Sequence, residues 1–182
     1  MSRLVLIDRD GTINVERHYL SSPEELLLLP GATSGIRRLN QLGLSVVIVT
    51  NQSAIGRGMF GPDRLKTIHD RLCDMLAEGG AKLAGIYVCP HRPDEGCGCR
   101  KPLPGMARQA AADFGANLAA AFVIGDKPCD IELGRSIGAA TILVRTGYGG
   151  RADGLVAKPD FVADDLDAAA QLIEIALGAR PS

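Results

Sequence analysis

Short apolar runs recur along the chain, and polar or turn-forming residues follow each of them. Every run spans three to six residues, many of them β-branched, which is typical of strands rather than helices. Runs with so few polar positions are typical of strands that are buried on both faces of a sheet. The pattern predicts six strands, at residues 3–7, 45–50, 85–89, 121–125, 141–145 and 161–163.

Between these runs, apolar residues recur at the three- and four-residue spacing of an amphipathic helix. The series are Leu65, Ile68, Leu72 and Leu76; Ile36, Leu39 and Leu42; and Leu166, Leu172, Ile173 and Leu177. Alternating strands and helices predict a doubly wound α/β fold, in which helices cover both faces of a parallel sheet through right-handed crossovers. Ligands bind beyond the carboxyl ends of such strands, so we expect functional residues just after each strand.

The length of the chain predicts its domain organisation. With 182 residues it has the size of one ordinary domain, and it contains no internal repeat or low-complexity linker. We therefore expect a single domain over residues 1–182. One strand and one helix fill most of the interval between residues 8 and 50, so we expect no large cap domain and a comparatively open site. The sequence specifies no oligomeric state, and a monomer is compatible with it.

Charge and hydropathy exclude two classes of partner. The 20 Lys and Arg residues nearly balance the 21 Asp and Glu residues, so nothing favours binding to nucleic acid or to an anionic membrane. No apolar run approaches the roughly 18 residues that cross a bilayer, and residues 1–10 lack the apolar core of a signal peptide. We therefore expect a cytoplasmic protein with no membrane partner.

The first strand is followed by the segment Asp8-Arg9-Asp10-Gly11-Thr12. Two carboxylates at positions i and i+2 of an extended chain point the same way, so Asp8 and Asp10 face one site. Such a pair can bind a hard cation, while one carboxylate attacks a substrate and the other transfers a proton. Taken alone, a solvated Asp-x-Asp-Gly turn explains this segment equally well. The residues at the other strand ends therefore have to decide.

The second strand ends in Thr50-Asn51-Gln52-Ser53. The hydroxyl and amide groups of this segment can hold phosphate oxygens, although polar residues are also favoured at helix starts for local reasons. Lys101 stands just ahead of a helix predicted for residues 104–114. It is a cation suited to neutralising a carboxylate or a phosphoryl group, and a solvated surface lysine is the ordinary alternative.

Two more carboxylates follow the fourth strand, in the segment that begins Gly125-Asp126-Lys127. Asp126 can ligate a metal ion at the same edge of the sheet. Asp130 can hold another group of the site by a hydrogen bond, or it can simply lie in the first turn of the next helix, where negative charge is favourable. Both readings of Asp130 remain open from its sequence position.

Three of the five cysteines lie close to a histidine in a short segment rich in Pro and Gly. Cys89, His91, Cys97 and Cys99 form a Cys-x-His-x5-Cys-x-Cys arrangement, a complete tetrahedral ligand set for a structural Zn²⁺ ion. An odd number of cysteines clustered in this way suits metal binding in a reducing compartment better than a disulfide framework. We expect the metal to order this zinc loop, residues 89–99, and to position the residues that follow it.

The residues at the strand ends occur in a characteristic order. They are Asp8, Asp10, Gly11, Thr12, Thr50, Lys101, Asp126 and Asp130. This ordered set resembles the motifs of the haloacid dehalogenase-like phosphohydrolases, and the resemblance covers nearly the whole chain. It implies a Rossmann-like fold and a phosphatase reaction through an aspartyl-phosphate, in which Asp8 is the nucleophile and Asp10 the general acid and then base. It also implies that Thr50 and Lys101 stabilise the phosphoryl group.

The same resemblance implies a catalytic Mg²⁺ ion. The ion would bind the Asp8 side chain, the Asp10 main-chain carbonyl and Asp126, and Asp130 would support these ligands. An anionic nucleophile that attacks an anionic phosphoryl group needs cations to offset their repulsion. A zinc-stabilised binding module without catalysis is the alternative from another class, and competent residues at every matched position argue against it.

The loops around the expected site favour a substrate with more than one anionic group. Several of their residues are cationic or can become so, namely Arg17, His18, Arg57, Arg92 and Arg100. Several anionic groups on one substrate would suit such loops on a chain whose charge is otherwise balanced. Arg92 is equally explained as a solvated surface residue, and we assign it no role.

Within the family, the segments around Arg57-Gly58 and Pro104-Gly105-Met106 are similar to those of phosphatases that act on heptose 1,7-bisphosphate. The similarity implies a small phosphorylated sugar as substrate. The residues implied to bind it are Glu16, Arg17, His18, Tyr19, Asn51, Gln52, Ser53, Arg100 and Lys127. The five residues between His91 and Cys97 equal the spacing in the related histidinol-phosphate phosphatases, so histidinol phosphate is the alternative substrate.

Overall fold

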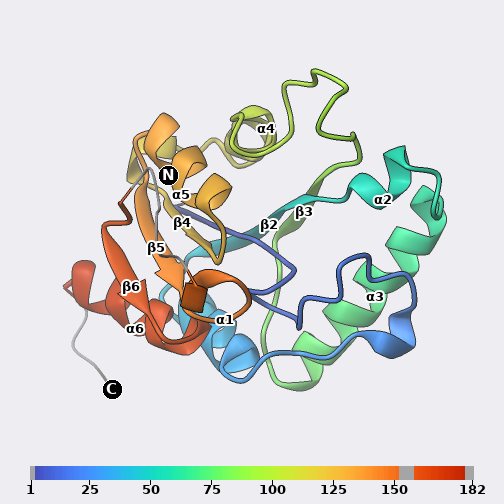
Figure 1. The fold of residues 1–182 in the computed structure, drawn as a ribbon. Coiled ribbons are helices and arrows are strands. Elements are labelled where there is room, and N and C mark those ends of the chain that lie inside the picture. Colours follow the sequence, from blue (N-terminus) through green and yellow to red (C-terminus); the bar gives the residue numbers. More distant parts are fainter. Residues whose placement is uncertain (1–2, 152–157, 179–182) are drawn as a thin grey trace.

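A six-stranded parallel sheet forms the centre of the fold (Figure 1), and the computed structural model describes residues 3–151 and 158–178. The strands are β1 (Leu4–Ile7), β2 (Ser45–Asn51), β3 (Gly85–Cys89), β4 (Phe122–Gly125), β5 (Ala140–Val144) and β6 (Phe161–Ala163). Their order across the sheet is β3-β2-β1-β4-β5-β6. The six predicted strands are confirmed, because each observed end lies within one residue of its predicted position.

Helices follow the strands in the predicted alternation. The helices are α1 (Ala32–Gln41), α2 (Ser53–Gly56), α3 (Pro62–Glu78), α4 (Gly105–Phe114), α5 (Pro128–Ser136) and α6 (Leu166–Ala176), with 3-10 turns η1 (Pro23–Glu25), η2 (Leu118–Ala120) and η3 (Gly149–Arg151). The one-turn elements were not predicted, because a single turn contains no apolar period. Within the described part of the chain, no helix combines the length and the apolar character needed to span a membrane.

The two faces of the sheet bury alternate residues of the same strand. On β1, Val5 and Ile7 belong to the core formed with α1, α3 and α6, whereas Leu4 and Leu6 belong to the core formed with α4 and α5. Helices therefore cover both faces (Figure 1), as the sequence predicted. Each buried aliphatic side chain contributes about 1.5–3 kcal/mol. The central strand is fixed on both sides, and so is the residue that follows it, Asp8.

Burial on both faces does not extend to the edge of the sheet. Phe161 and Val162 on β6 are 41% and 45% exposed. The apolar pattern of this strand resembles that of the central strands, but among the residues that the structure describes β5 is the one strand that pairs with it. The short length of β6 agrees with the way natural sheets limit their open edges.

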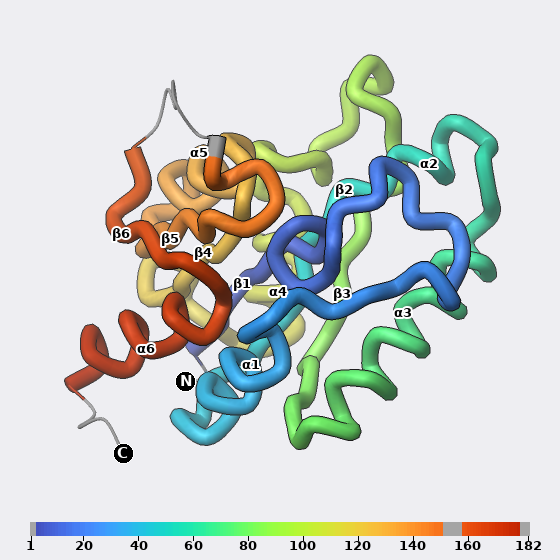
Figure 2. Tube along the Cα trace, turned by 60° about the horizontal axis from the view of Figure 1, so that its bottom comes forward, coloured from blue at the N-terminus to red at the C-terminus, as the bar shows by residue number. Residues whose placement is uncertain are grey.

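The long connection between β1 and β2 packs onto the fold instead of forming a second unit. Ile13, Leu20 and Leu26 of this connection are buried in the core that contains α1 and α3. In Figure 2 the blue segment after β1 runs past α2 and α3 before it enters α1, and η1 contacts α3. Three apolar anchors thus hold a segment that has little regular structure against the core.

Close packing of α1 against α6 generates a stability prediction. A Cβ added at Gly35 would lie 2.5 Å from the Leu166 carbonyl oxygen, so Gly35→Ala has to push the two helices apart. We expect the free energy of unfolding to fall by about 1–3 kcal/mol, as in other overpacked cores. Urea denaturation measures this loss. Gln41→Ala, at an exposed position of the same helix, is the control and should change stability by less than about 0.5 kcal/mol. Equal stability of the two variants would contradict the close packing.

Candidate active site

Three acidic side chains converge where the order of the sheet reverses. Asp8 follows β1, Asp126 follows β4, and Asp130 lies in the first turn of α5. All three are buried, and one carboxylate oxygen from each lies within 4.8 Å of those of the other two. β1 and β4 are adjacent parallel strands, so their carboxyl ends necessarily meet at this edge. The predicted convergence of these residues is therefore observed.

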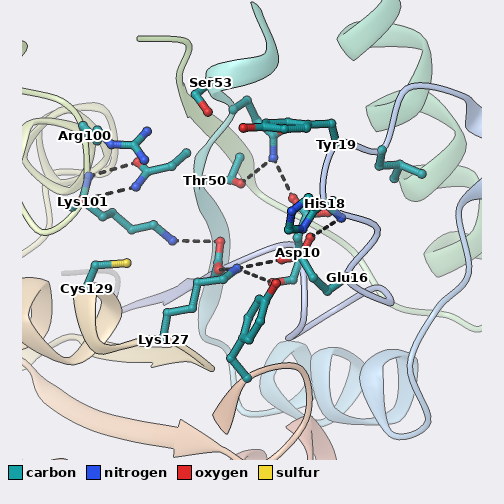
Figure 3. Close-up of a pocket in the computed structure, with 15 residues that line it drawn as sticks. Asp10, Glu16, His18, Tyr19, Thr50, Ser53, Arg100, Lys101, Lys127 and Cys129 are labelled. Atoms are coloured by element: carbon teal, nitrogen blue, oxygen red, sulfur yellow. Dashed lines mark hydrogen bonds and ion pairs between the residues drawn. The ribbon is translucent and has the colours of Figure 1, made fainter. Parts of the chain in front are cut away.

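Two lysines neutralise this acidic cluster. Lys101 Nζ lies 2.8 Å from Asp8 Oδ1 and 2.7 Å from Asp130 Oδ1. Lys127 Nζ lies 3.4 Å from Asp8 Oδ2 and 3.1 Å from Glu16 Oε2. Figure 3 shows both lysine side chains pointing to the same carboxylate at the base of the cavity. Asp130 holds Lys101 from the first turn of α5, where its Oδ2 also accepts from the Lys127 amide at 3.1 Å, so both readings of its sequence position are observed.

The charges of the cluster shift the ionisation of its members. Burial acts to raise the pKa of Asp8, but the charges of Lys101 and Lys127 outweigh burial and leave the pKa below its ordinary value. Asp8 is therefore an anion at neutral pH. Burial, together with the Asp8 charge, raises the pKa of Asp126 to about 7. An additional positive charge beside Asp126 would relieve this strain on its ionised form.

Three oxygen atoms at this site, all of them possible metal ligands, surround the positive charge of Lys127. Lys127 Nζ lies 3.0 Å from the Asp10 carbonyl oxygen, 3.4 Å from Asp8 Oδ2 and 3.7 Å from Asp126 Oδ1. Carboxylate and carbonyl oxygens are the ligands that Mg²⁺ prefers. These are the same three groups that the family resemblance assigns to the catalytic ion, and their hard, anionic donor set fits Mg²⁺.

Gly11 lets the chain turn tightly beneath Asp126. Its φ is +87°, and a Cβ at this position would collide with the Asp126 carboxylate. Thr12 Oγ1 donates to Asp126 Oδ1 at 3.4 Å, and the Tyr148 amide donates to Asp126 Oδ2 at 2.9 Å. The Asp-x-Asp-Gly-Thr segment therefore supports Asp126 as well as supplying Asp8 and Asp10.

The Asp10 carboxylate is held by donors that the sequence did not identify. Arg9 Nη2 donates to Asp10 Oδ2 at 2.8 Å, and Asn14 Nδ2 donates to Asp10 Oδ1 at 2.9 Å. Gln52, predicted to bind substrate, lines the cavity, and its Nε2 donates to Asp10 Oδ2 at 2.7 Å and to Thr50 Oγ1 at 2.9 Å. Asn14 follows the motif closely and was a visible candidate, whereas nothing in the sequence indicates that Arg9 folds back onto its neighbour.

A cavity of 270 Å³ opens above these groups. Its lining includes the predicted residues Asp8, Asp10, Glu16, His18, Tyr19, Thr50, Asn51, Gln52, Ser53, Arg100, Lys101 and Lys127, and also Leu20, Cys129 and Tyr148, which were not predicted. Figure 3 shows Arg100 and Lys101 on one side of this cavity and His18 and Tyr19 on the other. Arg17 is exposed and does not line the cavity, so the structure does not place it among the predicted substrate contacts.

Asn51 fixes the backbone of Lys101. Its Oδ1 accepts from the Lys101 amide at 3.0 Å, and its Nδ2 donates to the Lys101 carbonyl at 3.2 Å. The end of β2 is therefore tied to the segment between the zinc loop and α4. This clasp uses both polar atoms of the Asn51 side chain to position Lys101.

The four predicted zinc ligands lie together in the structure. Cys89 Sγ is 3.6 Å from Cys97 Sγ and 3.7 Å from His91 Nδ1, and His91 Nδ1 is 3.2 Å from Cys99 Sγ. A tetrahedron with Zn–S bonds of about 2.3 Å has edges of about 3.8 Å, so these separations fit a Zn²⁺ ion. Arg100 Nη1 donates to the His91 carbonyl at 3.2 Å, which joins the zinc loop to the rim of the cavity.

Comparison with known proteins agrees with this geometry. The HAD-hydrolase-like family model matches residues 98–169. The D-glycero-beta-D-manno-heptose-1,7-bisphosphate 7-phosphatase of Bordetella bronchiseptica is 40% identical over 172 residues, which cover 93% of this chain and 96% of that protein. The enzyme of the same name from Pseudomonas aeruginosa is 39% identical over 176 residues, which cover 95% of this chain and 99% of that protein.

A solved structure is similar over the same length. The crystal structure of D,D-heptose 1,7-bisphosphate phosphatase from B. bronchiseptica, complexed with magnesium and phosphate, matches with a TM-score of 0.90 and 39% sequence identity. The match covers 96% of this chain and 99% of that one. The chain therefore belongs to the haloacid dehalogenase-like phosphatases and, within them, to the family of the heptose-1,7-bisphosphate 7-phosphatases.

Proposed function

We propose that this chain is a Mg²⁺-dependent phosphatase that removes the C7 phosphate of D-glycero-D-manno-heptose 1,7-bisphosphate and yields heptose 1-phosphate for nucleotide-activated heptose. The observation that carries the proposal is the buried Asp8 carboxylate, which two lysines hold as an anion at the base of an open cavity. The names of the most similar relatives support the heptose substrate, and those of B. bronchiseptica and P. aeruginosa favour its beta anomer.

In the proposed reaction, an Asp8 oxygen attacks the C7 phosphorus and the bond from phosphorus to the sugar oxygen breaks. Asp10 gives its proton to the departing sugar oxygen, so that the leaving group departs as an alcohol. Asp10 then accepts a proton from water, which attacks the aspartyl-phosphate, releases phosphate and regenerates Asp8. Bound Mg²⁺ supplies positive charge that offsets the repulsion between nucleophile and phosphoryl group.

The remaining residues hold the phosphoryl group in place. Lys101 is buried between Asp8 and Asp130, and these two charges, acting against the effect of burial, raise its pKa above the ordinary value. It therefore stays a cation throughout and can bind phosphoryl oxygens without losing its proton. Thr50 presents a hydroxyl to the cavity from the end of β2 and is oriented by the Gln52 amide.

A second phosphate has a suitable partner at the rim of the cavity. Arg100 lines the cavity beside Lys101, and its hydrogen bond to the His91 carbonyl fixes it against the zinc loop. A guanidinium can bind the C1 phosphate or sugar oxygens through paired hydrogen bonds. We also propose that residues 1–182 act as one domain and a monomer in the cytoplasm, where a metal site built from three thiolates is maintained in reduced form.

The roles of Asp8 and Asp10 can be separated by trapping the phosphoenzyme. Asp8→Asn should abolish turnover and leave no acid-stable label from ³²P-substrate, because an amide has no anionic oxygen to attack phosphorus. Asp10→Asn should reduce kcat by about 10²- to 10⁴-fold, the usual contribution of general acid-base catalysis. Labelled phosphate on the Asp8→Asn protein, or unchanged kinetics of Asp10→Asn, would remove that residue from the mechanism.

The two metals should differ in how tightly they are held. Mild chelation with EDTA should abolish activity reversibly and leave near-stoichiometric zinc, because oxygen ligands hold Mg²⁺ weakly whereas thiolates hold Zn²⁺ tightly. Cys99→Ser should lose zinc, measured by mass spectrometry of the metal content, and should lower the melting temperature. Cys73→Ser is the matched control, because Cys73 lies on α3 outside the cluster and should keep both zinc and activity. A Cys99→Ser protein with full zinc and full activity would contradict the assignment.

Arg100 should discriminate between substrates with one and two phosphates. Arg100→Ala should lower kcat/KM for heptose 1,7-bisphosphate by about 10- to 150-fold, the equivalent of one charged hydrogen bond of roughly 1.5–3 kcal/mol. A small monophosphate has no distant group for Arg100 to bind and should be much less affected.

Two controls make this comparison decisive. Arg92→Ala should change neither rate, because Arg92 pairs with Asp94 and Glu95 and does not line the cavity. Assays of both heptose anomers and of histidinol phosphate test the substrate directly. Equal losses for both substrates in Arg100→Ala, or a wild-type preference for histidinol phosphate, would overturn the heptose assignment and leave the phosphatase chemistry intact.

A further inference from the structure

A buried guanidinium lies directly against the Asp10 carboxylate. The Arg9 side chain has 0% exposure, and arginine is rarely buried completely unless it is paired. Its Nη2 atom lies 2.9 Å from Asp10 Oδ1 and 2.8 Å from Asp10 Oδ2, and its Nε atom lies 3.2 Å from Oδ1. Nε and Nη2 thus bind both carboxylate oxygens, and the N–H groups of Arg9 Nη1 need another acceptor.

His69 supplies that partner from helix α3. Its Nε2 atom lies 3.1 Å from Arg9 Nη1. A guanidinium nitrogen can only donate, so Nε2 has to accept, and the imidazole is then neutral with its proton on Nδ1. Burial, together with the charge of Arg9, lowers the pKa of His69 to about 4. The neutral imidazole that the hydrogen bond requires is therefore also the stable form near neutral pH.

The packing of α3 fixes the position of the imidazole. His69 is 9% exposed and lies on the same face of the helix as its buried leucine and isoleucine series. It does not line the cavity. Any effect of His69 on catalysis therefore has to pass through Arg9 and Asp10 and not through a contact with substrate.

We infer that His69 is a positioning residue, which fixes the plane of the Arg9 guanidinium and through it the Asp10 carboxylate. The inference rests on the proposed role of Asp10 as general acid and base. Asp10 transfers a proton twice in each turnover, so its carboxylate has to return to the same geometry each time. The Arg9 side chain has several rotatable bonds, and the acceptor on α3 removes their freedom.

A purely structural role for His69 makes a different prediction. If the imidazole only filled space, an apolar side chain of similar size would serve equally well. If the imidazole positions Arg9, the acceptor atom matters, and its loss leaves a buried donor unsatisfied beside the reacting carboxylate. Replacements that keep the bulk or keep the acceptor therefore separate the two roles.

The experiment compares His69→Leu with His69→Gln. Leucine keeps apolar bulk and removes the acceptor, whereas glutamine can present its Oε1 atom to Arg9. We expect His69→Leu to lower kcat by about 10- to 100-fold while KM stays within about twofold, because the substrate contacts are unchanged. His69→Gln should recover most of that loss. His69→Met repeats the apolar replacement if the leucine variant does not fold.

Two reference variants keep the outcome unambiguous. Ile68→Val trims a buried side chain of the same helix that cannot bond to Arg9, so it should keep kcat within about twofold even where the melting temperature falls. Wild-type kcat in the apolar His69 variants, or a glutamine variant as slow as they are, would overturn the inference. Asp10→Asn is assayed beside them: if it retains full activity, the proposed function of Asp10 fails, whereas its inactivity beside a fully active His69→Leu refutes only the inference.

Discussion

One buried ammonium group between two carboxylates is the interaction on which the rest of the site depends. Lys101 Nζ lies within 2.8 Å of Asp8 and 2.7 Å of Asp130, and all three side chains are buried. Removal of one partner from such a buried ion pair typically costs about 3–5 kcal/mol, because an uncompensated charge remains. Asp126 adds a third carboxylate within 4.8 Å, so the cluster needs more than one cation. The fold therefore has to place cationic side chains beside the carboxylates that gather at the carboxyl ends of β1 and β4.

The path by which the chain delivers Lys101 explains the position of the zinc loop. No strand or helix lies between the end of β3 at Cys89 and the start of α4 at Gly105. Loops of this kind sample many conformations unless other contacts fix them. The four-residue cluster ties the loop together two residues before Lys101, and the Asn51 side chain then holds the Lys101 backbone against β2. A Zn²⁺ ion held by these residues, the first of which is the last residue of β3, would thus act on catalysis through the placement of one ammonium group.

The parts of this arrangement that follow from chain order were predictable from the sequence. The strands have a strong apolar signal, the chemistry follows the strand ends, and the zinc ligands are close neighbours in the chain, so these predictions are confirmed in position. The missed contacts depend on how long side chains turn in three dimensions. In an extended chain the side chains of Arg9 and Asp10 would point in opposite directions. The Arg9 side chain instead folds back onto Asp10, because its buried guanidinium has no access to water and needs a carboxylate partner.

The same limit applies to residues brought together from distant segments. Gln52 precedes α2 and His69 lies within α3, and no local sequence pattern links Gln52 to Asp10 or His69 to Arg9. Arg17 shows the same limit, because its neighbours Glu16 and His18 line the cavity whereas Arg17 does not. The sequence predicts which segments meet at the sheet edge, whereas the tertiary packing of a single helix or turn decides which side chains face inward.

The two carboxylates of the Asp-x-Asp motif show how environment divides chemical work between identical groups. The Asp8 side chain is 6% exposed and faces two ammonium groups, whereas that of Asp10 is 15% exposed and is gripped by a guanidinium and two amides. The lysines keep Asp8 ionised, as its proposed role of nucleophile requires. The proposed role of Asp10 as proton carrier needs an open route to substrate and water and a fixed position, and Asp10 has both, since it lines the cavity and is held by Arg9, Asn14 and Gln52. Their different surroundings therefore suit Asp8 to attack and Asp10 to transfer protons, although the two residues are only two positions apart in the sequence.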